Sequence, residues 1–205
     1  MQWIGKAVLQ FSSEPEFFSR GIVSKILRQP FLSEFFVLFL LLSQVTSCIT
    51  AKEIPESSHT RKIENLPFYQ QESYQCGPAS LAGVLNYWGV AVTPDEIARN
   101  IFSLAARGTL TIDMVLYAQQ KGLSAEQYKG SIENLKQNID SGLPVVVLVD
   151  YGGILYQMNH FMVIIGYNEY GILANSGKDN EKFIPEDDFL KAWEKTNFWT
   201  LRIRK

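Results

Sequence analysis

One cysteine and one histidine in this sequence stand where their side chains can act together as nucleophile and base. Cys76 comes directly before Gly77-Pro78 and an apolar run, and His160 opens the β-branched stretch HFMVIIGY. A thiol at the first turn of a helix is expected to have a lowered pKa, because the unpaired amides and the helix dipole favour an anion. A nearby imidazole can then take the proton from sulfur. The pair predicts nucleophilic catalysis, and a small buried core thiol is the alternative.

Such chemistry also needs a residue that orients the base. Asn175 ends the strand that returns from His160. We expect the two side chains to face each other across an antiparallel hairpin, within reach of a hydrogen bond. An asparagine in that place fixes the imidazole tautomer, as in Cys-His-Asn enzymes. A polar residue that merely ends a strand is the alternative.

Donors for a developing oxyanion are the last requirement. The backbone N–H of Cys76 is one donor, and a glutamine side chain in the preceding stretch FYQQESYQC can be the other. Gln70, Gln71 and Gln75 all lie there, and spacing alone does not choose among them. One cysteine and one histidine in the folded region fall short of a zinc-binding set, so we expect no metal and no cofactor.

Composition narrows the class of protein. The 205 residues are 46% hydrophobic and 20% charged, which is typical of a globular protein with a sizeable core. The formal net charge is −2, and no stripe of lysine and arginine is present, so we expect no nucleic-acid partner. The sequence also contains no glycine-rich phosphate loop, so we expect no ATP.

The first 48 residues have the features of an export signal. An apolar run, FFVLFLLL at 35–42, follows Lys25 and Arg28 and precedes small residues. This run is shorter than the roughly 20 residues that span a membrane, and an uncleaved anchor or a buried helix is the alternative. It leads to VTSC, which resembles the bacterial lipobox and implies that Cys48 is diacylated at the mature N-terminus. We expect residues 1–22 not to be translated, because a start at Val23 leaves a signal of ordinary proportions.

These features predict an exported, membrane-anchored bacterial lipoprotein that faces the periplasm or the cell exterior. Lipid on Cys48 would leave Cys76 without a disulfide partner in an oxidising compartment, which favours a functional thiol. The polar segment 49–65 is expected to be a linker between anchor and domain. The folded domain is then residues 66–205.

The domain is predicted to be α+β, with helices first and an antiparallel sheet later. Caps, glycines and apolar spacing place the helices, and β-branched runs place the strands. Thr93, Thr111 and Ser131 are the predicted helix caps. The expected elements are helices at 78–88, 94–102, 111–120, 132–140 and 185–193 and strands at 144–151, 160–167, 171–176 and 198–204.

The candidate residues, in this order, resemble the bacteriocin-processing (double-glycine) cysteine peptidase family. The resemblance rests on Gln70 with the stretch CGPASL from Cys76, on His160 with FMVIIGY, and on a polar residue after the return strand. It implies a papain-like fold with N-terminal helices packed on a C-terminal antiparallel sheet. It also implies that Cys76 is the nucleophile, His160 the base, Asn175 the orienting residue and Gln70 the oxyanion donor.

Two departures limit what the resemblance implies. The family triad ends in aspartate followed by proline, whereas this chain has Asn175-Ser176-Gly177. The sequence also shows no transporter or ATPase module, so a leader-peptidase role is not carried over. We predict a cysteine peptidase that cleaves peptide bonds of a peptide or protein substrate through a thioester acyl-enzyme. An acyl or amide transferase and a non-catalytic peptide-binding lipoprotein are the alternatives.

Overall fold

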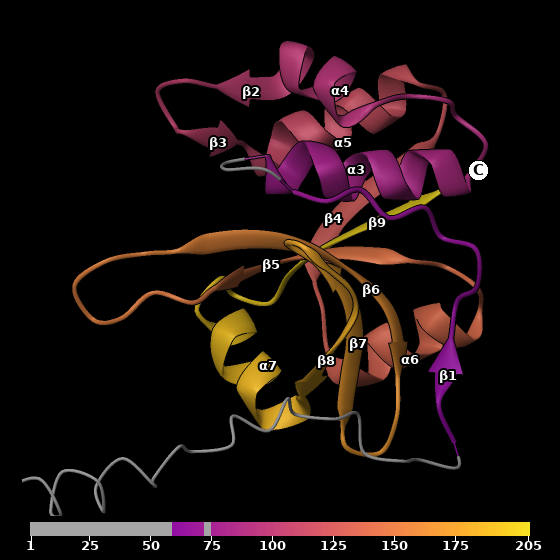
Figure 1. The fold of residues 1–205 in the computed structure, drawn as a ribbon, viewed down its shortest axis with the longest axis vertical. Coiled ribbons are helices and arrows are strands. Elements are labelled where there is room, and N and C mark those ends of the chain that lie inside the picture. Colours follow the sequence, from indigo (N-terminus) through magenta and orange to yellow (C-terminus); the bar gives the residue numbers. More distant parts are fainter. Residues whose placement is uncertain (1–58, 72–74) are drawn as a thin grey trace, which may run out of the picture. The chain divides into compact units, whose positions relative to one another are not determined.

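Residues 59–71 and 75–205 are the part of the chain that the computed structural model describes (Figure 1). They belong to the unit Ile54–Lys205. The predicted export signal, Cys48 and most of the predicted linker lie outside these residues. The elements are β1 (Arg61–Lys62), α3 (Cys76–Tyr87), α4 (Pro94–Ile101), β2 (Phe102–Ser103), β3 (Gly108–Thr109), α5 (Thr111–Gln120), β4 (Ser124–Lys129), α6 (Ile132–Asp140), β5 (Val145–Asp150), β6 (Asn159–Tyr167), β7 (Gly171–Ser176), β8 (Asp179–Pro185), α7 (Glu186–Glu194) and β9 (Trp199–Arg204).

An antiparallel sheet carries the fold. Seven strands of the described chain form it in the order β4-β9-β5-β6-β7-β8, and β1 pairs with the end of β6. The strands β5, β6 and β7 follow one another in the chain and are neighbours in the sheet. This places the start of β6, where His160 lies, inside the sheet rather than at an edge. A separate two-stranded sheet, β2 with β3, lies beside α4 and α5 (Figure 1).

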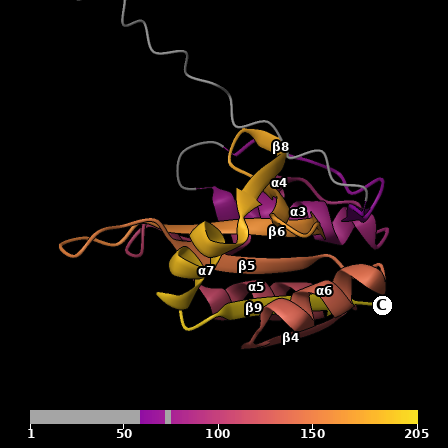
Figure 2. The same ribbon diagram turned by 90° about the horizontal axis from the view of Figure 1, so that it is seen from below.

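Helices cover both faces of the sheet. The helices α3, α4 and α5 pack on one face, and α6 and α7 pack on the other (Figures 1 and 2). The apolar sequence of β5 follows from this arrangement. Val146 lies in the core on the side of α3, α4 and α5, and Val145, Val147 and Val149 lie in the core on the side of α6 and α7. Side chains alternate along a strand, so a strand covered on both faces needs apolar residues throughout. The predicted α+β arrangement is confirmed, with helices also on the second face.

Two of the three helix N-caps predicted from the sequence are the N-caps in the structure. The Thr93 hydroxyl accepts a hydrogen bond from the Glu96 N–H at 3.2 Å, and the Ser131 hydroxyl accepts one from the Asn134 N–H at 3.2 Å, so both predicted caps are confirmed. The predicted cap at Thr111 is wrong by one residue, since Leu110 is the N-cap of α5 and Thr111 is its first helical residue. The predicted hairpin is confirmed as β6 and β7.

Several short or polar strands were not predicted. Most residues of β4 are exposed, and most residues of β8 are exposed or partly buried. The strand β4 pairs with the distant β9, and β8 pairs with β7 through an irregular register. Their sequences carry little alternation, because the pairing comes from the neighbouring strand. At the other end, β1 pairs with β6 and Ile63 is only 6% exposed, so this part of the predicted linker belongs to the folded unit. Within the described residues no helix is both long and apolar enough to span a bilayer.

Candidate active site

The first turn of α3 carries Cys76. Cys76 is the first helical residue and is partly buried, and the residues from Gly77 to Leu85 are all buried. Gly77 is required by packing, because a Cβ at this position would lie 2.8 Å from the Cβ of Thr109 in β3. The close approach fixes the N-terminus of α3 against the small β2–β3 sheet. The helix that holds the thiol is therefore constrained from its first residues.

The Cys76 thiol lies beside the first residues of β6. Its sulfur receives a hydrogen bond from the backbone of Phe161, the residue that follows His160. Burial nevertheless raises the pKa of the thiol, and this outweighs the lowering by the backbone groups of Phe161, Gly77 and Cys76 itself. The expectation of a lowered thiol pKa at the helix N-terminus is therefore wrong. Desolvation by the surrounding core is the stronger of the two effects.

His160 occupies the start of β6 and is held from two sides. Its Nε2 and the hydroxyl of Ser176 form a hydrogen bond of 3.0 Å. Its ring also packs against the ring of Tyr151, with 6.1 Å between the ring centroids. Burial, and next the positive charge of Lys182, lower the pKa of His160 to about 4. The imidazole is therefore neutral near pH 7 and can accept a proton.

Asn175 does not face His160, contrary to the expectation from the hairpin. It pairs with Val163, and its Oδ1 accepts a hydrogen bond of 3.1 Å from the N–H of Glu181. Side chains alternate along paired strands, so Asn175 shares a face with Val163 while His160 shares the opposite face with Ser176. Sequence reasoning missed Ser176. The register of β6 against β7 shifts between Ile164 and Gly166, and this shift, which the sequence does not reveal, places Ser176 rather than Asn175 on the face of His160.

The three glutamines differ in their surroundings. Gln70 is exposed, and Gln75 is partly buried as the N-cap of α3. Gln71 is only 8% exposed; its N–H donates to the Gly177 carbonyl at 2.9 Å and its Nε2 donates to the Ser80 hydroxyl at 3.5 Å. The Gln71 Oε1 is buried without a partner among the described residues. Gln71 thus ties the segment before Cys76 to Gly177, just after β7, and to α3.

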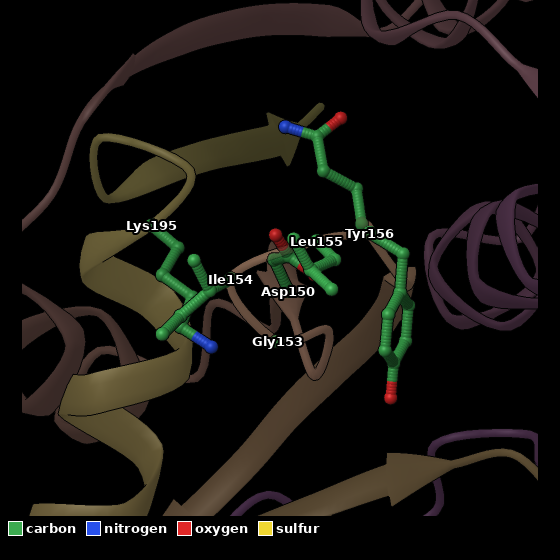
Figure 3. A pocket seen from close by; sticks show the side chains of 7 residues that line it. Asp150, Gly153, Ile154, Leu155, Tyr156 and Lys195 are labelled. Carbon is green, nitrogen blue, oxygen red and sulfur yellow. The ribbon is translucent and has the colours of Figure 1, made fainter.

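A loop of apolar residues connects β5 to β6 and ends next to His160. Ile154 and Leu155 are 104% and 95% exposed. Asp150, which is buried, accepts 2.7 Å hydrogen bonds from the N–H groups of Gly152 and Met158 and so holds the base of the loop. Lys195 donates to the Gly152 carbonyl at 2.7 Å. An open cavity of about 740 Å³ lies at this loop and is lined by Asp150, Gly153, Ile154, Leu155, Tyr156, Gln157 and Lys195. Figure 3 shows these side chains from close by.

Among the described residues, no three His, Cys, Asp or Glu side chains are grouped as metal ligands. The Cys76 thiol can act as a nucleophile, and the neutral imidazole of His160, the residue before Phe161, can act as a base. At the start of α3, Cys76 also has a backbone N–H that can donate to an oxyanion.

Comparison with known sequences shows which family the chain belongs to. The chain matches the Peptidase_C39 like family over residues 63–200 and belongs to it. An uncharacterized protein from Methanothermobacter thermautotrophicus (strain Delta H) is 33% identical over 103 residues, which is 50% of this chain and 65% of that protein. One from Methanothermobacter marburgensis is 30% identical over 124 residues, or 60% of this chain and 80% of that protein.

Solved structures share the fold at low sequence identity. A C39-like protein from Bacillus anthracis has a TM-score of 0.58 at 19% identity and covers 72% of this chain and 98% of its own. A double glycine motif protease from an AMS/PCAT transporter, in complex with the leader peptide, has a TM-score of 0.57 at 23% identity. The match covers 70% of this chain and 94% of that chain. The peptidase domain of Streptococcus ComA, a bifunctional ABC transporter, has a TM-score of 0.55 at 20% identity. The match covers 67% of this chain and 96% of that chain. These likenesses confirm the predicted papain-like α+β fold.

Proposed function

We propose that this protein is a cysteine peptidase with Cys76 as nucleophile and His160 as general base. The observation that carries the proposal is the contact of the Cys76 sulfur with the backbone of Phe161, which follows His160, in a chain of a peptidase family. The sulfur attacks the carbonyl carbon of a peptide bond, and the thiol proton passes to the imidazole. The protonated imidazole then gives this proton to the leaving amine, and water hydrolyses the thioester.

The oxyanion of the tetrahedral intermediate would be held by two donors. One is the backbone N–H of Cys76 at the start of α3, and the other is the side-chain amide of Gln70. Gln70 is exposed, so its amide can turn toward a bound substrate. Gln71 is already engaged with Ser80 and Gly177, which supports a structural role for it.

A peptide is the substrate class that the fold supports best. A structural neighbour was solved with a leader peptide bound, at 23% identity to this chain. The loop before His160 presents exposed aliphatic side chains, Ile154 and Leu155, on which an apolar part of a peptide could lie.

We propose further that lipid on Cys48 anchors the protein outside the cytoplasm, where exported peptides or proteins would be its substrates. Intact-mass measurement of the native protein tests the anchor: an unmodified Cys48 would contradict it.

Acylation by p-nitrophenyl acetate tests the mechanism without knowledge of the natural substrate. Mass spectrometry follows acetyl-Cys76 in the purified protein, with N-acetylcysteine as the reference thiol. We expect Cys76 to be acetylated and the thioester then to hydrolyse, and we expect His160→Ala to slow both steps because the same imidazole is the base in each. Thioester decay that does not depend on His160 would refute the proposal.

The same assay separates the alternative functions. An added amine that takes up the acetyl group faster than water indicates an acyl transferase. An absence of acylation beyond that of the reference thiol indicates a peptide-binding protein. Comparison of protein N-termini in cells that express the wild type or Cys76→Ala would then identify substrates, and no difference between them would argue against a peptidase with cellular substrates.

A further inference from the structure

We infer that Ser176 is the positioning residue of His160: its hydroxyl holds the imidazole Nε2 and leaves Nδ1 as the nitrogen that takes the thiol proton. The inference rests on the proposed function, since it requires His160 to be the base. It differs from the sequence expectation, which gives this role to Asn175. The 3.0 Å hydrogen bond between His160 Nε2 and Ser176 Oγ is its main support.

The surroundings of Ser176 suit this role. The residue is 4% exposed and ends β7, so the backbone that carries its hydroxyl is fixed by pairing with both β6 and β8. The register pairs Val163 with Asn175, which puts Ser176 diagonally across from His160 on the same face. Tyr151 packs against the imidazole ring as well. A ring held by a hydroxyl and by a neighbouring ring has little freedom to rotate.

The proposed mechanism uses the tautomer that has the ring hydrogen on Nε2, so that Nδ1 receives the proton. With the ring hydrogen on Nε2, this N–H donates to Ser176 Oγ, and Nδ1 keeps its lone pair. As the sulfur attacks, its S–H bond breaks and Nδ1 gains that proton, so the imidazolium carries a hydrogen on each nitrogen. A serine can accept the Nε2 hydrogen bond but brings no charge, unlike the aspartate usual in the resembling family.

A neutral partner therefore leaves the imidazolium without a counter-charge. The groups that surround the ring agree with this. Lys182 on β8 is positive and lowers the pKa of His160, while Tyr151, which packs against the ring, is uncharged near neutral pH. Burial likewise keeps the Cys76 thiol uncharged near neutral pH. The resting pair is then a neutral thiol and a neutral imidazole, and charge develops only as the proton moves.

Two carboxylate variants that differ by one position test the inference. Ser176→Asp places a negative charge at the imidazole, and we expect it to raise the pKa of His160 from about 4 by about 1 to 3, measured by NMR titration of the full protein. The matched control Asn175→Asp keeps an acceptor for the Glu181 N–H and should leave the His160 titration unchanged. The His160→Ala spectrum assigns the signal.

Thioester hydrolysis supplies the second measurement. We expect Ser176→Ala to lower the rate of acetyl-Cys76 hydrolysis by about 10- to 100-fold, because a base that is free to rotate is poorly placed. Ser176→Thr keeps the hydroxyl and should restore most of the rate. Should Ser176→Ala fail to fold, the NMR comparison still decides the question.

A His160 pKa that rises in Asn175→Asp but not in Ser176→Asp would overturn the inference and return the role to Asn175. Equal hydrolysis rates for wild type and Ser176→Ala would also overturn it. Failure of the proposed function looks different: hydrolysis would then be insensitive to His160→Ala, whatever the two carboxylate variants do to the titration.

Discussion

The carboxylate of Asp150 accepts a 2.7 Å hydrogen bond from the backbone N–H of Met158 and thereby closes the loop that leads into His160. A second 2.7 Å bond comes from the N–H of Gly152. One side chain thus holds both ends of a loop whose tip is apolar and exposed, and Lys195 adds a bond to the same loop at the Gly152 carbonyl.

We predict that Asp150→Ala lowers the free energy of unfolding by about 2 kcal/mol, since it leaves two amide groups without their acceptor. The matched variant Asp150→Asn keeps a similar shape and one acceptor oxygen, and should lose less. Urea denaturation of the two variants measures the difference. Equal stability of Asp150→Ala and wild type would show that water replaces the carboxylate without cost.

Acid should weaken the same contact. The N–H groups of Met158 and Gly152 lower the pKa of Asp150 below its ordinary value. A carboxyl group whose pKa is lowered by folding stabilises the protein fully above its unfolded pKa, near 4, and loses this contribution as the pH falls through the folded value. Urea denaturation below pH 4 should therefore show a steeper loss of stability in wild type than in Asp150→Asn. Parallel pH profiles would contradict this.

The pH dependence of Cys76 alkylation should be that of a neutral thiol and a neutral imidazole, rather than that of a resting thiolate–imidazolium pair. Burial raises the thiol pKa, and His160, with a pKa of about 4, stays neutral above that pH. We expect the rate of reaction with iodoacetamide to keep rising with pH through the range from 5 to above 9, because only the thiolate reacts. Peptide mapping separates Cys76 from Cys48. A rate that is constant between about pH 5 and 8 would instead demonstrate a thiolate–imidazolium pair.

The neighbouring glutamines should respond differently to replacement. Gln70→Ala is expected to slow acetylation of Cys76 by about 100-fold, the typical effect of removing one oxyanion donor, and to leave stability unchanged. Gln71→Ala removes the contact with the Ser80 hydroxyl and should lower the free energy of unfolding by about 1 kcal/mol. Stability comes from urea denaturation and reactivity from mass spectrometry. The reverse pattern would transfer the oxyanion role to Gln71.

Contact between Gly77 and Thr109 should be critical for the start of α3. Gly77→Ala brings a new Cβ to 2.8 Å from the Thr109 Cβ, and overpacking of this kind costs about 1 to 3 kcal/mol. The double variant Gly77→Ala/Thr109→Gly removes the opposing atom and should recover part of the loss. Urea denaturation of the single and double variants gives the coupling. Additive effects would mean that the helix shifts freely away from β3.

What the sequence determined by itself is local. Thr93 and Ser131 satisfy N–H groups within the next turn, so their helices begin where the sequence indicates. The run 145–149 is apolar on both faces, and that pattern alone predicts a central strand. Cys76 and His160 could be identified because each is a rare residue next to a clear structural signal.

Only the tertiary structure decided how distant residues meet. The strands β4 and β8 exist because a neighbour offers unpaired backbone groups, which their own side chains do not reveal. The choice of Ser176 over Asn175 beside His160 depends on strand register, and a shift of one residue exchanges the two faces. The thiol pKa depends on how much core surrounds Cys76. Burial and register are properties of packed neighbours, so only the folded chain fixes them.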